Sequence, residues 1–192
     1  MRPGSDETMP SWTAPRRTTA LWTVALAGMM GSGKSTVARL LARRLGRRAI
    51  STDAAVEALA GMPVERVFAE RGEAAFRALE RRVVRGLRGP LVADLGGGAF
   101  CDAGNAEHLL AVGTVVFLDV SPGEAARRLG AGTGRPLAPR WEPLLRRRLP
   151  LYRRAQLTVE VDGLAPDAVA RRVADLLRSD GSPRVPGLPE GA

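Results

Sequence analysis

The glycine-rich stretch G-M-M-G-S-G-K-S-T, from Gly28 to Thr36, constrains the fold more than any other part of the sequence. Its spacing is that of a phosphate-binding loop, whose backbone amides and lysine enclose phosphate oxygens. Such a loop joins a buried strand to a helix. Here an apolar run from Leu21 to Ala27 precedes it, and Thr36 to Leu45 follows with helical spacing. The loop therefore predicts an α/β fold that binds a nucleotide.

Lys34 is the only lysine in a chain of 192 residues that holds 29 lysines and arginines together. A slender ammonium fits inside the loop as a point charge, where a planar guanidinium does not. We therefore interpret the loop as intact, with Lys34 reaching the β- and γ-phosphates and the Ser35 hydroxyl binding Mg²⁺. The other expected nucleotide contacts of the loop are Gly31, Ser32, Gly33 and Thr36.

Further apolar runs predict the remaining strands of a sheet. They lie at Ala49 to Thr52, Leu91 to Leu95, Val115 to Val120 and Leu157 to Val161. Segments with helical spacing, such as Glu73 to Leu87, separate them. Strands that alternate with helices predict a five-stranded parallel sheet with helices on both faces and ligands at the carboxyl ends of the strands.

The length of the chain and the composition of its ends predict one domain over residues 21–178. The segments 1–20 and 179–192 are rich in Pro, Gly and Ser, and we expect both to be disordered. A domain of this size buries enough surface to need no disulfide. The single cysteine, Cys101, and the lack of a long apolar run predict a protein of the reducing cytoplasm that does not enter a membrane.

The charge of the chain limits its partners. The formal net charge is +9, the pI is about 11.3, and only 4% of the residues are aromatic. The arginines scatter along helical stretches without interleaved aromatic residues. We interpret them as solvated helix faces, ahead of attraction for phosphate substrates and well ahead of nucleic-acid binding, so we expect no nucleic-acid partner.

A nucleotide loop alone leaves GTPases, ATPases and small-molecule kinases open. The guanine-specifying pattern N-K-x-D requires a second lysine, which this chain lacks. The chain is also too short for a large motor-type ATPase. A small-molecule kinase is therefore the favoured class.

Six segments, by their order and spacing, resemble the shikimate kinase family over about Val24 to Leu177. They are G-M-M-G-S-G-K-S-T, S-T-D-A-A-V-E from Ser51, F-A-E-R-G-E-A-A-F-R-A-L-E from Phe68, L-G-G-G-A from Leu95, G-R-P-L from Gly134 and R-L-P-L-Y from Arg148. The resemblance implies the three-layer fold of nucleoside monophosphate kinases, with a mobile lid at about residues 129–141. It also implies ATP-dependent phosphorylation of the 3-hydroxyl of shikimate, a step of chorismate and aromatic amino-acid biosynthesis. The partners it implies are the small molecules ATP and shikimate, the cofactor is Mg²⁺, and we expect a monomer.

The resemblance implies that Asp53 holds the attacking hydroxyl and accepts its proton. A carboxylate at the carboxyl end of a strand can orient an alcohol in line with the γ-phosphate. The alternative is that Asp53 caps the helix expected from Ala54 to Ala60. The two roles are compatible.

The resemblance assigns the carboxylate of shikimate to Arg77 and Arg148, with Glu80 orienting Arg77. A planar guanidinium is the expected partner of a carboxylate. The alternative for Arg77 and Glu80 is an ordinary ion pair between residues three apart on a helix surface. Arg148 ends the run Arg146-Arg147-Arg148, so a register shift of one residue is the alternative, but the Pro150-Leu151-Tyr152 that follows favours Arg148.

Three more features match the family. Gly97 and Gly98, in the triplet that begins at Gly96, are expected to let the substrate ring approach the backbone, although a plain loop is the alternative. Arg135, in T-G-R-P-L, resembles the lid arginine that stabilises charge during phosphoryl transfer. The residues that resemble those flanking the adenine ring are Arg128 and Pro166.

Two positions depart from the family pattern in opposite directions. Where the family has Asp-Thr-Asp, this chain has Ser51-Thr52-Asp53, so a carboxylate that helps hold magnesium is absent. In Leu91-Val92-Ala93-Asp94, an aspartate ends the strand where the family has a neutral residue, and this pattern is typical of magnesium-binding aspartates in other nucleotide-binding proteins. We hypothesise that the carboxylate has moved from one strand to its neighbour, which makes Ser35 and Asp94 the expected metal ligands. We call this the carboxylate exchange; its alternative is that Asp94 merely caps a turn.

Two other functions stay open. One is a kinase of another small carboxylated polyol such as gluconate, against which the F-R-x-x-E and G-G-G segments argue. The other is a nucleotide-binding protein whose catalysis weakened with the change at Ser51, against which the complete set of Asp53, Arg77 and Arg148 argues.

Overall fold

The computed structural model describes residues 22–130 and 141–179. Five strands form one parallel sheet in the order β2-β3-β1-β4-β5. The strands are β1 (Thr23–Ala27), β2 (Arg48–Ser51), β3 (Leu91–Asp94), β4 (Gly113–Asp119) and β5 (Leu157–Glu160). The predicted five-stranded parallel sheet is confirmed. Residues 1–20 and 180–192 of the segments predicted to be disordered, and residues 131–140 of the predicted lid, lie outside the described residues, whereas Ser179 is helical.

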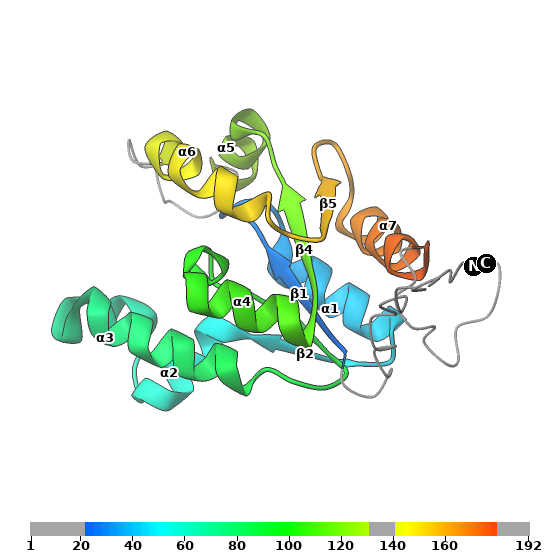
Figure 1. Cartoon of the computed structure of the whole chain (residues 1–192). Coiled ribbons are helices and arrows are strands. Elements are labelled where there is room, and N and C mark those ends of the chain that lie inside the picture. The colour runs from blue at the N-terminus through cyan, green and yellow to red at the C-terminus, as the bar shows by residue number, and fades with distance from the viewer. Residues whose placement is uncertain (1–21, 131–140, 180–192) are drawn as a thin grey trace, which may run out of the picture.

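Helices cover both faces of this sheet, which confirms the predicted three-layer arrangement. They are α1 (Lys34–Arg44), α2 (Thr52–Ala60), α3 (Val64–Gly86), α4 (Ala103–Val112), α5 (Pro122–Gly130), α6 (Trp141–Tyr152) and α7 (Pro166–Ser179), with a 3₁₀ turn, η2 (Ala99–Cys101). Figure 1 shows α1 and α7 packed together on one face of the sheet and α4, with α3 beside it, on the other. The connections to α1, α2, η2, α5 and α7 all begin at the carboxyl ends of strands, so this edge of the sheet is the expected place for a ligand.

The central strands are buried on both sides, which explains their uninterrupted apolar sequence. All five residues of β1 are buried, and β4 is buried at every position except its last. A parallel strand covered by helices on both faces has no solvent side and needs no polar alternation. α1, in contrast, buries only the stripe that contains Val37 and Leu41, which is the pattern of a helix lying on a sheet.

Most predicted strand boundaries shift by one or two residues in the structure, and two differences bear on the site. β2 ends at Ser51, and Thr52, which was expected to end the strand, instead begins α2. α3 is longer than the predicted helix from Glu73 to Leu87, because a first helical part runs from Val64 to a kink at Gly72 (φ 77°, ψ 169°). The predicted helix corresponds to the part after the kink.

The kinked α3 and α2 enclose a small apolar cluster of their own. Its buried members are Val56, Ala60, Val67, Phe76 and Val83. The main core between the sheet and its covering helices contains none of these side chains. We call the smaller cluster the satellite core.

The surface agrees with the interpretation of the arginines as solvated helix faces. Arg43, Arg82 and Arg171, for example, are exposed on α1, α3 and α7. Within residues 22–130 and 141–179, no helix combines the length and the apolar character needed to cross a membrane.

Candidate active site

The glycine loop leads from the end of β1 into α1, as the sequence predicts. Gly28, Gly31 and Gly33 have φ values of 148°, 84° and 86°, a region that residues with a Cβ rarely adopt. Gly33 is also the N-cap residue of α1. The loop therefore presents the positive end of the α1 dipole to any anion placed over it.

Lys34 is the first residue of α1, and its side chain folds back over the glycine loop. Nζ donates hydrogen bonds to the backbone oxygens of Gly28 (2.9 Å) and Met29 (3.0 Å). Burial lowers the pKa of Lys34 from its ordinary value, while the carboxylates of Asp94 and Asp53 oppose this shift. The ammonium thus lies between the loop and two carboxylates at the edge of the sheet.

The hydroxyl groups of the loop differ in their surroundings. Ser35 and Thr36 are exposed in the first turn of α1. Ser32 is buried, and its Oγ has no hydrogen-bond partner in the part of the chain that the structure describes. A buried hydroxyl without a partner is costly, and a phosphate oxygen in the loop can accept the hydrogen bond that it lacks.

The carboxyl ends of β2 and β3 lie side by side, as the carboxylate exchange requires. Ser51 and Asp94 are partners in the register of the two parallel strands. The Ser51 hydroxyl caps α2 by accepting a hydrogen bond from Ala54 N (3.3 Å). The alternative in which Asp53 caps this helix is therefore wrong, because Asp53 already belongs to its first turn.

Thr52 fastens the start of α2 to the end of β3. Its buried hydroxyl accepts a hydrogen bond from Gly96 N (2.7 Å) and donates one to Asp94 O (3.3 Å). These bonds hold Asp53, the next residue, against the loop that follows β3. A Cβ at Gly96 would collide with Asp53 Oδ1, so only glycine leaves room for the carboxylate there.

Asp53 and Asp94 are close enough to influence each other's charge. Among the described residues, neither carboxylate takes part in a hydrogen bond or an ion pair. Asp53 keeps contact with solvent, but the protein atoms around it displace part of its hydration, which raises its pKa; Asp94 raises this pKa further and Lys34 lowers it. A raised pKa makes Asp53 a stronger base than an ordinary aspartate, which suits a group that accepts a proton from an alcohol.

The glycine triplet after β3 collects side chains from three helices. Asp53 of α2 lies over Gly96. A Cβ built at Gly98 would be 2.7 Å from Arg77 Nη1 of α3, and a Cβ built at Gly97 would be 3.4 Å from Arg148 Nη1 of α6. The structure thus brings together the three charged side chains that the sequence predicts for the acceptor substrate, and glycine makes their close approach to the loop possible.

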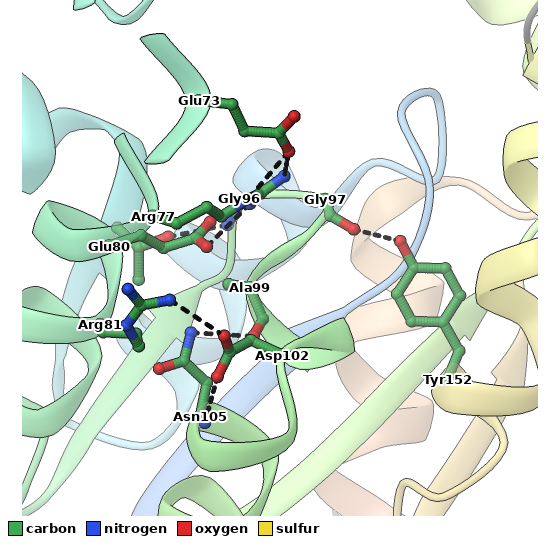
Figure 2. A network of polar contacts seen from close by, with 11 residues as sticks. Glu73, Arg77, Glu80, Arg81, Gly96, Gly97, Ala99, Asp102, Asn105 and Tyr152 are labelled. Atoms are coloured by element: carbon green, nitrogen blue, oxygen red, sulfur yellow. Dashed lines mark hydrogen bonds and ion pairs between the residues drawn. The ribbon is translucent and has the colours of Figure 1, made fainter. Parts of the chain in front are cut away.

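Arg77 is held by carboxylates on its own helix (Figure 2). Nη1 lies 2.8 Å from Glu80 Oε2, and Nη2 lies 3.2 Å from Glu73 Oε1. The Glu80 side chain is only 2% exposed, whereas that of Glu73 is 68% exposed. Burial raises the pKa of Glu80 and Arg77 opposes this. The alternative of an ordinary surface pair is therefore wrong for Glu80, which anchors the guanidinium from the protein interior.

α6 contributes both Arg148 and a tyrosine that lies one helical turn further on. Arg146 and Arg147 are exposed, and Arg148 is the half-buried member of the run that lies beside Gly97, a placement that agrees with the choice of Arg148. The Tyr152 hydroxyl donates a hydrogen bond to Gly97 O (Figure 2). The Tyr152 ring stacks on Phe117 of β4 with 5.1 Å between the ring centroids.

Replacing Tyr152 by Phe is expected to lower the free energy of unfolding by about 1–2 kcal/mol, because it removes a buried hydrogen bond and leaves Gly97 O without this donor. The loop that faces Arg148 then loses a fixed point, so we also expect a higher KM for the acceptor. Urea unfolding and steady-state kinetics measure the two effects. Arg154→Ala, an exposed change two residues along the chain, is the control and should alter neither quantity.

The predicted adenine-flanking residues lie on two segments that meet beside the glycine loop. Arg128 belongs to α5, and Pro166 is the first residue of α7. Arg128 donates hydrogen bonds to Gly31 O (3.3 Å) and to Val161 O (2.7 Å), which starts the connection to α7. Arg135, the predicted lid arginine, lies outside the described residues.

Three residues of this site were not identified from the sequence. Thr52 and Tyr152 act through hydrogen bonds to distant backbone atoms, and no spacing in the sequence reveals such contacts. Glu124, whose carboxylate holds Arg128, did leave a signal, because a glutamate four residues before an arginine on a helix is a typical ion-pair spacing.

The donor atoms at the sheet edge fit a magnesium ion that binds together with a nucleotide. Among the described residues, no group of three or more His, Cys, Asp and Glu side chains forms a metal site. Mg²⁺ does not need such a group, since waters and phosphate oxygens usually supply most of its ligands. Asp94 offers a carboxylate with no hydrogen-bond or ion-pair partner within residues 22–130 and 141–179, Ser35 offers an exposed hydroxyl, and the Ser51 hydroxyl is already engaged as a helix cap.

Known proteins resemble this chain over most of its length. The family model described as shikimate kinase matches residues 30–178. A shikimate kinase of Thermobifida fusca is 43% identical over 164 residues, which cover 81% of this chain and 95% of that protein. A shikimate kinase of Moorella thermoacetica is 40% identical over 164 residues, covering 81% and 94%.

A solved structure gives the same result in three dimensions. Shikimate kinase from Acinetobacter baumannii in complex with shikimate matches with a TM-score of 0.78 at 34% identity, over 84% of this chain and 96% of that chain. Because the family model matches residues 30–178 and a relative 43% identical covers 81% of the chain, the chain belongs to the shikimate kinase family.

Proposed function

We propose that this chain transfers the γ-phosphoryl group of ATP to the 3-hydroxyl of shikimate. The observation that carries the proposal is the meeting of Asp53, Arg77 and Arg148 on the glycine triplet, within electrostatic reach of Lys34. A carboxylated ring alcohol needs cations for its carboxylate and a base for its hydroxyl, and this loop offers both. The shikimate bound in the Acinetobacter baumannii relative supports this choice of acceptor.

Each side chain then has a distinct task. Phosphoryl transfer depends mostly on positioning and on compensation of charge. The glycine loop and the N-terminus of α1 hold the triphosphate, and the Lys34 ammonium compensates charge on the β- and γ-phosphate oxygens. Arg77 and Arg148 hold the carboxylate of the acceptor, which turns a ring hydroxyl toward Asp53. Asp53 accepts the proton of this hydroxyl as its oxygen attacks phosphorus, and Arg135 adds positive charge on the side of the lid.

We propose Mg²⁺ as the metal cofactor, with Ser35 and Asp94 as its protein ligands. When bound, the ion supplies positive charge to the phosphate oxygens. The register that pairs Ser51 with Asp94 supports the carboxylate exchange, because it keeps a carboxylate at the same edge of the sheet, one strand away. The use of the Ser51 hydroxyl as a helix cap also favours Asp94 over Ser51 as a ligand.

Replacing Asp94 by Asn is expected to raise the Mg²⁺ concentration for half-maximal activity by about tenfold or more, because a neutral amide is a weaker ligand for a hard cation. A second readout does not depend on turnover. Calorimetry of ADP binding with and without Mg²⁺ should show that Mg²⁺ no longer increases the affinity of the variant for ADP. Asp119→Asn, at the end of β4, is the matched control and should keep this increase. Adding Ser51→Asp to Asp94→Asn should bring the Mg²⁺ concentration for half-maximal activity back toward that of the wild type. A wild-type value in Asp94→Asn alone would refute the carboxylate exchange.

The proposed reaction is tested by measuring ADP release with shikimate, with gluconate and with no acceptor, each with and without Mg²⁺. We expect release only with shikimate and Mg²⁺ together. Turnover with gluconate but not with shikimate would assign the chain to another class of polyol kinase. Tight nucleotide binding without release on either acceptor would identify a protein that has lost catalysis.

We further propose that the enzyme acts as a monomer in the cytoplasm. The charged residues that face the acceptor all come from one chain, so the site needs no second subunit. Light scattering of the purified protein tests the monomer, and a dimer that dissociates with loss of activity would contradict it.

A further inference from the structure

Arg128 is held edge-on by oxygen atoms at each nitrogen of its guanidinium. Nε donates to Glu124 Oε1 (2.7 Å), Nη1 to Gly31 O (3.3 Å) and Nη2 to Val161 O (2.7 Å). These acceptors belong to α5, to the glycine loop and to the connection between β5 and α7. Three of the five N–H groups of the guanidinium are thus bonded to protein, which fixes its plane and makes its flat face a surface on which a ring can stack.

Glu124 is the charged acceptor among the three, and it is itself held in place. Its backbone N donates to Ser121 Oγ (3.3 Å), and its two carboxylate oxygens receive hydrogen bonds from Arg127 (2.7 and 2.8 Å). The Glu124 side chain is 12% exposed, whereas that of Arg127 is 70% exposed. The Arg127 guanidinium lowers the pKa of Glu124 to about 2, with help from Arg128, so Glu124 is a carboxylate throughout the neutral range.

The segments around Arg128 are tied to one another at two further points. Ser121 N donates a hydrogen bond to Asp162 Oδ1 (2.9 Å), which links the start of α5 to the connection between β5 and α7. Gly31 packs directly on α5, since a Cβ built at Gly31 would be 3.1 Å from Ala125 Cα. The phosphate-binding loop and the two segments that carry Arg128 and Pro166 therefore form one connected wall.

We infer that Glu124 is a positioning residue for the purine ring of the nucleotide, acting through Arg128. By holding Nε, the Glu124 carboxylate fixes the plane of the guanidinium, and the base stacks on the face of that plane. Without the carboxylate, Nε loses its acceptor and the plane can tilt, so stacking the base requires ordering the arginine first. The inference rests on the proposed function, because it presupposes a nucleotide whose phosphates lie on the glycine loop.

The test measures ligand binding by calorimetry with no acceptor present. Glu124→Ala should weaken ADP binding roughly 5- to 20-fold, because a charge-assisted hydrogen bond is lost, and Glu124→Gln, which keeps an acceptor oxygen, should weaken it less. Binding of inorganic tripolyphosphate, which has no base, should stay unchanged in both variants. In turnover assays, the KM for ATP should rise while kcat and the KM for shikimate do not.

Arg66→Ala is the matched control, since it breaks an exposed arginine–glutamate pair on α3 and should leave ADP affinity unchanged. Normal ADP affinity in both Glu124 variants, an equal loss of tripolyphosphate affinity, or an equal loss in Arg66→Ala would each overturn the inference. The isosteric Glu124→Gln guards against a general disturbance of α5, which a lower thermal midpoint would reveal. Failure of the proposed acceptor chemistry would appear only in the turnover assays and would leave the ADP measurements valid.

Discussion

Replacing Asp53 by Asn is expected to lower kcat by roughly 10²- to 10⁴-fold, the usual contribution of a positioned general base. The amide keeps the size of the side chain and its place over Gly96, but it cannot accept the proton of the attacking hydroxyl. Arg77 and Arg148 still hold the acceptor carboxylate, so the KM for shikimate should change far less than kcat. Steady-state kinetics at saturating ATP measure both quantities.

The stability of the same variant separates a catalytic loss from a structural one. Because the pKa of Asp53 is raised in the folded protein, the folded state binds this proton more tightly than the unfolded state does. Ionisation of Asp53 therefore lowers the free energy of unfolding as pH rises from the ordinary pKa through the raised one. Asp53→Asn removes this penalty and should be at least as stable as the wild type at neutral pH. A marked loss of stability would mean that the fall in kcat does not report on catalysis.

The pH dependence of the wild type follows from the same shift. Only ionised Asp53 can accept a proton, so kcat/KM for shikimate should fall as pH drops through a pKa that lies above the ordinary aspartate value of 3.8. Asp94 contributes to the raised pKa through its negative charge. In Asp94→Asn, measured at saturating Mg²⁺, the acidic limb of the profile should therefore move to lower pH.

Replacing Lys34 by Met is the second large change, and we expect it to reduce kcat/KM for ATP by roughly 10²- to 10³-fold, the usual cost of removing one preorganised donor to developing charge. Lys34→Arg should recover little of this, because the glycine loop that encloses Nζ through Gly28 O and Met29 O has no room for a planar guanidinium. Steady-state kinetics at varied ATP concentration measure the loss. Arg43→Ala, an exposed change on the same helix, should behave as the wild type. Substantial activity in Lys34→Arg would contradict the argument that the loop selects an ammonium.

The sheet could be predicted because its strands are buried on both faces. Leu91 to Ala93 and Val115 to Leu118 are continuous apolar segments for that reason, and the helical segments between the strands indicate parallel connections. The kink of α3 at Gly72 was not predicted, because a single glycine in a helical pattern does not reveal the left-handed φ that it adopts.

Site residues that lie in short motifs could be predicted from the sequence, whereas those that act through contacts with distant segments could not. Lys34 and Asp53 lie in short segments whose spacing carries their chemistry, so they were found from the sequence. Arg148 was chosen over its two neighbours from the Pro150-Leu151-Tyr152 that follows it, whereas its closeness to Gly97 is visible only in the fold. The roles of Thr52 and Tyr152 were not predicted, because each forms a hydrogen bond with the backbone of a segment more than 40 residues away.

The satellite core makes the two halves of the site mechanically unequal. Asp53 and Arg77 are carried by α2 and α3, which pack on each other through the satellite core, while Lys34 is carried by α1, which packs on the main core. A local opening that separates α2 from α3 disrupts the satellite core and the hydrogen bonds of Glu57 and Arg71 between the two helices, but it leaves the main core intact, so its free energy is a fraction of that of global unfolding. The part of the site that receives the acceptor can therefore open locally, while the part that binds the triphosphate stays rigid.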